Sequence, residues 1–127
     1  MDEIEFRGKS VMTQEWIYGY YYCDGLSEYI LPKAPIDDYS IYEIQRGTSG
    51  QLVGIADNGK GIYVGDILKN PYFKTPWKNA RIILGMTYPK PKGEIIGNVF
   101  EDYQVLDKTQ HFKNREVREW LYNRNIL

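Results

Sequence analysis

Residues 53–68 read VGIADNGKGIYVGDIL, with the dipeptide Asn58-Gly59 between two apolar runs. A type I′ turn needs a positive φ at both central residues, and Asn-Gly is the pair that adopts it most readily. The stretch therefore predicts an antiparallel hairpin around a two-residue turn, with strands near residues 51–56 and 61–68. This hairpin makes a β fold the first expectation for the chain.

The 127 residues fit a single domain with a core of its own. Sixteen Lys+Arg against 17 Asp+Glu leave a net charge of −1, so the chain as a whole has no general attraction to nucleic acid or anionic membranes. A local basic patch is still compatible with this balance. The single cysteine, Cys23, cannot form an intramolecular disulfide. The N-terminus is acidic, and no apolar run approaches the roughly 20 residues of a membrane span. We expect a cytoplasmic protein without membrane contact.

Turn-bounded apolar segments predict six further strands, and only the end of the chain is helical in pattern. The strands are expected at 4–7, 15–23, 28–31, 41–45, 80–88 and 94–100. Gly8-Lys9-Ser10 and Asp24-Gly25 are the expected turns after the first two strands. Residues 70–79, with two prolines and three aromatics, predict an ordered loop.

The predicted helix covers residues 115–123, with Asn114 as its cap. Its apolar stripe contains Val117, Trp120 and Leu121, spaced for one helix face. Such a short helix is marginal alone and needs the β domain or a partner to pack against. The fold class is therefore mainly β, a small barrel or sandwich with a short C-terminal α-helix.

Aromatic residues make up 15% of the chain and concentrate in the second predicted strand. Alternation along that strand places Trp16, Tyr18, Tyr20 and Tyr22 on one face. Such a row can bind a peptide, stack nucleic-acid bases or join copies of the chain. It can equally be a buried core face or a cross-strand aromatic ladder.

Three blocks of the sequence resemble the YopX-like proteins of phages and prophages, a family without an established biochemical function. The blocks are FRGK (6–9) with EWIYGY (15–20), then GQ (50–51), GI (54–55), DNGK (57–60) and IYVGDI (62–67), and last EIIGNVFE (94–101). In two places the chain departs from the family pattern, since Gly61 and Val64 stand where charged residues are common. The loop before the Asn-Gly turn is also one residue shorter.

The resemblance implies a phage or prophage origin and a small SH3-like, partly open barrel. It implies a YopX-like β domain over residues 1–106 and a separate tail over 107–127. The family motif around the hairpin comprises Asn58, Gly59, Lys60, Tyr63, Gly65 and Asp66. The resemblance supplies no reaction, cofactor or catalytic residue.

No constellation in the sequence predicts catalysis, a cofactor or a metal site. Asp66, at the end of a strand, offers a carboxylate for base or metal chemistry, but Asp at such a place more often bonds a turn. Cys23 and His111 are the only thiol and imidazole, and nothing places them together. The segment 47–50 reads GTSG and lacks the ending of a phosphate loop, so it is expected to be a connection.

The tail is rich in basic residues, and it predicts either a solvated helix face or a phosphate contact. The leading hypothesis is a non-enzymatic module that binds a phage or host protein, with a homo-oligomer as one form of such contact. The alternative is a small nucleic-acid-binding barrel that uses the aromatic face and the basic tail. An enzyme that uses Asp66 is the third hypothesis.

Overall fold

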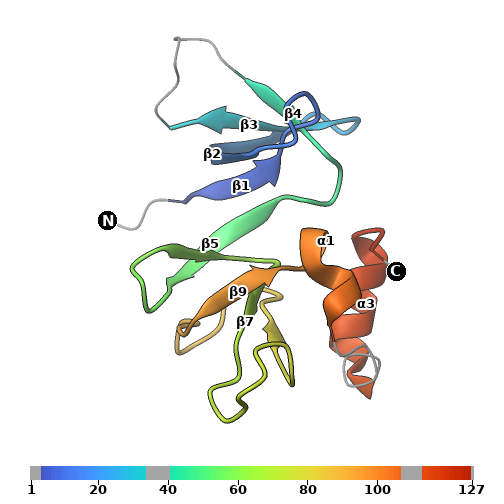
Figure 1. Cartoon of the computed structure of the whole chain (residues 1–127). Helices are drawn as coiled ribbons and strands as arrows, with labels where there is room; N and C mark the ends of the chain where they lie inside the picture. The colour runs from blue at the N-terminus through green and yellow to red at the C-terminus, as the bar shows by residue number, and fades with distance from the viewer. Residues whose placement is uncertain (1–3, 34–40, 107–112, 127) are drawn as a thin grey trace. The chain divides into compact units, whose positions relative to one another are not determined.

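The computed structural model describes residues 4–33, 41–106 and 113–126. Its chain divides into two compact units, Met1–Leu52 and Val53–Leu127. The strands are β1 (Phe6–Lys9), β2 (Trp16–Cys23), β3 (Glu28–Pro32), β4 (Tyr42–Ile44), β5 (Gly50–Ile55), β6 (Gly61–Tyr63), β7 (Asp66–Leu68), β8 (Arg81–Ile82) and β9 (Ile95–Asn98). The helical segments are α1 (Val99–Asp102), the 3₁₀ turn η1 (Tyr103–Val105) and α3 (Arg115–Asn123). Figure 1 labels most of them.

The expectation of a mainly β chain with a short C-terminal helix is confirmed. The strands form two antiparallel sheets, with the hydrogen-bonded orders β4-β3-β2-β1-β5-β6 and β8-β7-β9. Among the described residues these sheets form no closed barrel. The boundary between the two units falls within β5. The division expected at residue 106 rests on the extent of the family resemblance and stays a prediction.

In the first unit, the sheet is built around β2, the longest strand, which pairs with β1 on one side and with β3 on the other. The predicted turn at Asp24-Gly25 is confirmed, because Gly25 has a φ of 91° and Asp24 Oδ1 accepts hydrogen bonds from the Leu26 and Ser27 amides. These backbone bonds, Ser27 first, lower the pKa of the Asp24 carboxyl below its usual range.

The expected turn at Gly8-Lys9-Ser10 is wrong, because β1 runs through Lys9. Gly8 faces Ile44, and a Cβ on Gly8 would lie 2.3 Å from the Ile44 Cδ1 atom. A glycine is needed here for close approach within the sheet, not for a turn. The chain turns later, at residues 11–13.

The end of β1 also reaches β4. Ser10 and Ile44 form an isolated bridge, the Gln45 amide donates to the Lys9 carbonyl at 2.7 Å, and the Val11 amide donates to the Glu43 carbonyl at 3.0 Å. The four-stranded part of this sheet is therefore curled so that its first and last strands meet at one end. Ile30 and Ile44 are buried within it.

In the second unit, the Asn58-Gly59 hairpin is present, but its turn is not of type I′. Only Gly59 has a positive φ, 86°, and its amide donates to the Ala56 carbonyl at 2.9 Å. The Ala56 amide in turn donates to the Lys60 carbonyl at 2.7 Å, which closes a three-residue loop. Such loops combine a type I turn with one left-handed residue. Asn58 serves through its side chain, since its Oδ1 accepts from the Lys60 amide.

The predicted strand at 61–68 is split into β6 and β7, which belong to different sheets. Gly65 has a φ of 97°, which ends the extended run, and Asp66 begins β7. A Cβ on Gly65 would lie 2.5 Å from the Phe100 ring. Both the backbone angle and the packing therefore require glycine at this position.

The two last predicted strands are also shorter than expected. Of residues 80–88 only β8 is extended. The Ile83 amide still donates to the Asp66 carbonyl in the β7–β8 register, but the Ile83 carbonyl accepts from the Gly65 amide, one residue out of register, and the ladder ends there. Residues 94–100 give β9 and then α1, in which the Phe100 and Glu101 amides donate to Asn98 Oδ1 at 3.1 Å. Asp102 accepts from the Asn98 amide in return, a reciprocal cap.

The helix α3 has the predicted bounds and cap. Asn114 Oδ1 accepts from the Val117 amide at 3.2 Å, and Val117 and Leu121 are buried. These two side chains share a core with Ile67, Val99 and further apolar residues of the second unit. A second cluster in that unit surrounds Ile62, and the Trp120 ring packs against both clusters.

The Gly65→Ala variant should be less stable than the Gly59→Ala variant. Both positions have a positive φ, which costs a non-glycine residue about 1–2 kcal/mol. At Gly59 a Cβ meets nothing within 4 Å, whereas at Gly65 it overlaps Phe100, and such overpacking adds about 1–3 kcal/mol. Urea unfolding of the two variants measures the difference. Equal midpoints would contradict the steric role given to Phe100.

Candidate functional site

The predicted aromatic row lies on one face of β2, and most of it is exposed. Tyr18, Tyr20 and Tyr22 are 45%, 51% and 56% exposed, while Trp16 is half-buried. The guanidinium carbon of Arg7 lies 4.6 Å from the centre of the Trp16 ring. The alternative of a buried core face is therefore wrong for the three tyrosines.

Residues of β3 widen this row, because directly paired residues of antiparallel strands point to the same side. Leu31 lies opposite Tyr20 and is 40% exposed, and Tyr29 lies opposite Tyr22 with its ring centre 6.0 Å away. We call this surface the tyrosine face. It consists of Tyr18, Tyr20, Tyr22, Tyr29 and Leu31.

One end of the tyrosine face borders a hollow and a pair of charges. The hollow has a volume of about 370 Å³ and is lined by Trp16, Tyr18, Pro32 and neighbouring residues of the same unit. Lys33 and Glu5, which also line it, form an ion pair at 3.3 Å. The face thus offers an apolar surface with ring hydroxyls and a charged rim, which is the composition of many protein interfaces.

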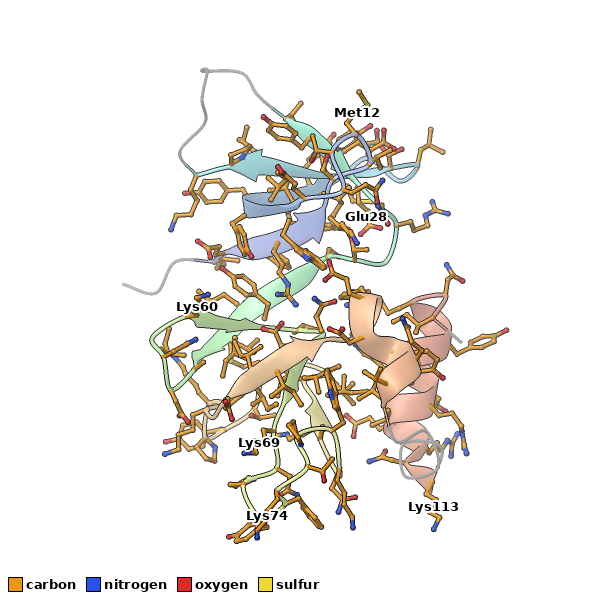
Figure 2. The ribbon with its side chains drawn as sticks, viewed as in Figure 1. Met12, Glu28, Lys60, Lys69, Lys74 and Lys113 are labelled. Carbon is orange, nitrogen blue, oxygen red and sulfur yellow. The ribbon has the colours of Figure 1, made fainter. Side chains whose placement is uncertain are left out.

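The opposite face of β2 serves structure. The Tyr21 hydroxyl donates to Glu28 Oε1 at 2.8 Å, and its ring centre lies 5.3 Å from that of Phe6. Burial raises the pKa of the Tyr21 hydroxyl above its ordinary value, and the Glu28 carboxylate raises it further. Glu28, labelled in Figure 2, is therefore a structural carboxylate on the first unit.

Glu28 also binds the segment 47–50, which the sequence predicts to be a connection and not a phosphate loop. The Gly47 amide donates to Glu28 Oε2 at 3.1 Å, and the Ser49 hydroxyl donates to Oε1 at 3.2 Å. The Thr48 hydroxyl accepts from the Lys9 amide and donates to the Gln45 carbonyl. A protein carboxylate thus takes the donors that a phosphate would use.

The motif residues around the hairpin divide into an exposed turn and a buried group. Asn58, Gly59 and Lys60 are exposed, whereas Tyr63 and Asp66 are buried. Asp66 Oδ2 accepts from the Tyr63 amide at 2.8 Å, and its side chain is 2% exposed. This is the turn-bonding role of Asp, and it leaves the carboxylate poorly accessible to a substrate.

The remaining polar groups supply few elements of a catalytic centre. Cys23 is exposed, and His111 lies outside the described residues, so their pairing stays open. In the described parts of the chain, no group of three or more His, Cys, Asp and Glu side chains is arranged to hold a metal ion. No helix over the same ranges is long and apolar enough to cross a lipid bilayer.

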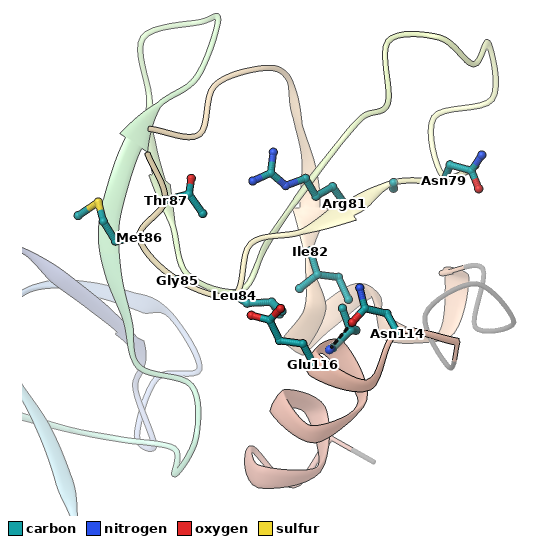
Figure 3. A pocket seen from close by; sticks show the side chains of 11 residues that line it. Asn79, Arg81, Ile82, Leu84, Gly85, Met86, Thr87, Asn114 and Glu116 are labelled. Atoms are coloured by element: carbon teal, nitrogen blue, oxygen red, sulfur yellow. Dashed lines mark hydrogen bonds between the residues drawn. The ribbon is translucent and has the colours of Figure 1, made fainter. Parts of the chain in front are cut away.

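The sequence did not indicate a cavity of about 490 Å³ in the second unit. It is lined by residues of β8 and the following loop, and by the start of α3 (Figure 3). Arg81 and Glu116 contribute opposite charges, but Asn114 is engaged in its cap. Its two lining segments are far apart in sequence and carry no shared motif. Only the folded structure brings them together, so the sequence could not predict this cavity.

Two basic residues of the predicted tail are engaged within α3. Arg115 Nε donates to Glu119 Oε1 at 2.9 Å, and the guanidinium of Arg124 lies 4.9 Å from the Trp120 ring centre. This part of the tail is therefore closer to a solvated helix face than to a phosphate-binding stripe.

Comparisons with protein-family models, with curated proteins and with solved structures found no match to this chain.

Asp66→Ala should destabilise the protein, while Asp66→Asn should cost less. Alanine leaves the buried Tyr63 amide without this acceptor, a loss of about 1–3 kcal/mol, whereas the asparagine carbonyl can still accept. Thermal and urea unfolding measure the order of stability of the unmodified chain, Asp66→Asn and Asp66→Ala. An Asp66→Ala variant as stable as the unmodified chain would contradict the turn-bonding role and favour the hypothesis of an enzyme that uses Asp66.

Stability should fall at alkaline pH through Tyr21. Above the ordinary tyrosine pKa of 10.0 the unfolded chain ionises this hydroxyl, while the folded chain with its raised pKa keeps the proton. Stability is therefore constant with respect to Tyr21 below that pH and is lost as pH rises above it. Urea unfolding should show that the free energy of unfolding falls less with pH in the Tyr21→Phe variant than in the unmodified chain. An equal fall in both proteins would refute this role of Tyr21.

Proposed function

We propose that this chain is a non-enzymatic binding module that contacts another protein through the tyrosine face of its first unit. The observation that supports this most directly is the exposure of Tyr18, Tyr20 and Tyr22 on one strand face. Tyrosine is enriched in the contact centres of protein interfaces, since it buries a large apolar ring and keeps a hydrogen-bonding hydroxyl. Contiguous exposed rings of this kind mark interaction surfaces.

The net charge of the first unit as a whole favours protein over nucleic acid. Residues 1–52 contain four Lys+Arg and nine Asp+Glu, a net charge of −5. A polyanion is repelled by such a unit, whereas a protein with an apolar patch and a basic rim is attracted. We therefore assign the tyrosine face to a protein partner of that chemistry. A second copy of the chain has it only in its second unit, which carries twelve Lys+Arg against eight Asp+Glu.

The non-enzymatic part of the proposal is supported by how the chemically active groups are used. Asp66 bonds a backbone amide in a buried turn, and Glu28 bonds Tyr21, Gly47 and Ser49. Each carboxylate that the chain encloses in this way stabilises its fold. Both are unsuited to bind and release a substrate.

The relationship to the YopX-like proteins belongs to the same proposal. With it come a phage or prophage origin, action in the bacterial cytoplasm and an SH3-like, partly open barrel. One feature of the first unit supports the barrel: the Ser10–Ile44 bridge joins the first and last strands of the four-stranded part at one end, which curls the sheet.

The proposal predicts that the double substitution Tyr18→Ser with Tyr20→Ser abolishes protein capture. Tagged protein and variant are incubated with lysate of phage-producing bacteria after nuclease treatment, and bound proteins are quantified by mass spectrometry. Light scattering on the purified chain tests the second copy as partner. Losing central tyrosines costs typically 2 kcal/mol or more at an interface, about a thirtyfold loss of affinity for each.

The matched control is Tyr72→Ser with Tyr88→Ser, two tyrosines of the second unit that are 91% and 101% exposed. This control should capture the same proteins as the unmodified chain. Equal capture by the unmodified chain and by both double variants would overturn the proposed function. So would an unmodified chain that is monomeric and captures no protein.

A further inference from the structure

Residues 69–92 of the second unit contain six Lys+Arg and no Asp or Glu. The basic residues are Lys69, Lys74, Lys78, Arg81, Lys90 and Lys92. The whole second unit has twelve Lys+Arg against eight Asp+Glu, a net charge of +4, opposite to that of the first unit. The near-neutral total therefore conceals a strongly basic segment.

In the three-stranded sheet, both ends of the loop 69–80 and the last residues of the loop 83–94 lie at the same end of the sheet. Leu68, the last residue of β7, pairs with Arg81 at the start of β8 and with Ile95 at the start of β9. The Lys69 amide donates to the Glu94 carbonyl at 2.9 Å, and the Lys69 ammonium pairs with the Glu94 carboxylate at 4.0 Å, so Glu94 is the one acidic residue of these two loops. The loop 69–80 and the last part of the loop 83–94 therefore meet here, and Figure 2 shows Lys69 and Lys74 on the lower side of the second unit.

The basic loops are ordered by contacts that leave their outer rings exposed. Trp77 packs against the core, the ammonium of Lys78 lies 5.3 Å from the Phe73 ring centre, and the Phe73 amide bonds the Asn70 carbonyl at 3.1 Å. This agrees with the ordered loop expected for residues 70–79. Tyr72, in contrast, is 91% exposed.

The second loop is held to the hairpin of the same unit. The Asp57 amide donates to the Gly93 carbonyl at 2.8 Å, and a Cβ on Gly54 would lie 2.2 Å from the Pro91 carbonyl oxygen. The backbone of residues 91–93 is therefore in close contact with β5 and its turn. Tyr88, in the same loop, is fully exposed.

From this arrangement we propose that the loops 69–80 and 83–94 form a binding surface for single-stranded nucleic acid. Lys74, Lys90 and Lys92 are exposed and supply positive charge for phosphates, and Tyr72 and Tyr88 supply rings on which bases stack. This surface is separate from the tyrosine face and does not depend on the function proposed for it.

Single strands fit this surface better than a duplex, because exposed rings on loops can stack only on bases that are already unpaired. In the described part of the second unit, α3 does not have the features of a helix that binds a duplex groove. It buries Val117 and Leu121, and it pairs Arg115 with Glu119. An anionic membrane or an acidic protein would also use the charges, but neither provides planar bases to stack on both rings.

The test is fluorescence anisotropy with a labelled oligothymidylate of about 16 nucleotides, the upper site size of a small binding fold. The full chain should bind, with an affinity that falls steeply with salt. Tyr72→Ser with Tyr88→Ser should weaken binding by about 5- to 150-fold for each base that loses its ring. Lys74→Gln with Lys92→Gln should make the slope of log affinity against log salt shallower by about 1.4.

Two controls separate this surface from others on the chain. Tyr18→Ser with Tyr20→Ser on the first unit, and Lys113→Gln outside the loops, should both bind the oligonucleotide like the unmodified chain. The substituted side chains of the loops are exposed, and thermal unfolding verifies that the variants fold.

Three results would overturn the proposal. One is the absence of binding at low salt. Another is loss of binding in the Tyr18/Tyr20 variant with retention in the Tyr72/Tyr88 variant, which would assign nucleic acid to the tyrosine face. The third is salt-dependent binding that is unaffected by loss of Tyr72 and Tyr88 and equal for dextran sulfate, which would reduce the surface to a general attraction for polyanions.

Discussion

The hydrogen bond from the buried Tyr63 amide to the Asp66 carboxylate is the interaction on which the second unit depends. Together with the positive φ of Gly65, it turns the chain between two strands that would otherwise form one. The same turn is bound from both sides, since the Gly65 amide donates to the Ile83 carbonyl and the Gly65 carbonyl accepts from the Val99 amide. A buried polar group stabilises only when it is bonded, and this turn satisfies that condition with several bonds at once.

How far the fold follows from sequence can be judged element by element. The α3 helix was predictable in full, because a cap and a periodic apolar stripe are local signals. The split of residues 61–68 was not, because a glycine and an aspartate in a strand-like run do not show that Phe100 lies against that glycine. The α1 helix was missed although Asn98 and the acids after it carry a capping signal, since the apolar run before them indicated a strand.

The candidate sites show the same division between local and distant information. Alternation in residues 16–22 predicted which aromatic side chains share a face, but not whether that face is exposed, which depends on the partners of the sheet. The basic loops are visible in the sequence as a run without acids, but the net charge of −1 sums this run with the acidic residues elsewhere in the chain. When the net charge is counted separately for each compact unit, it is −5 for the first unit and +4 for the second.

The bonding of β4 has a consequence for how any partner can engage the first unit. A short terminal strand normally presents unpaired amides and carbonyls, which invite another chain to extend the sheet. Here β3 pairs with β4 on one side, and residues 9–11 bond Glu43 and Gln45 on the other. Backbone groups on both sides of β4 are thus engaged within the unit. A partner that contacts the first unit at β4 must therefore bind side chains, which makes recognition there depend on sequence and prevents extension of the sheet by added strands.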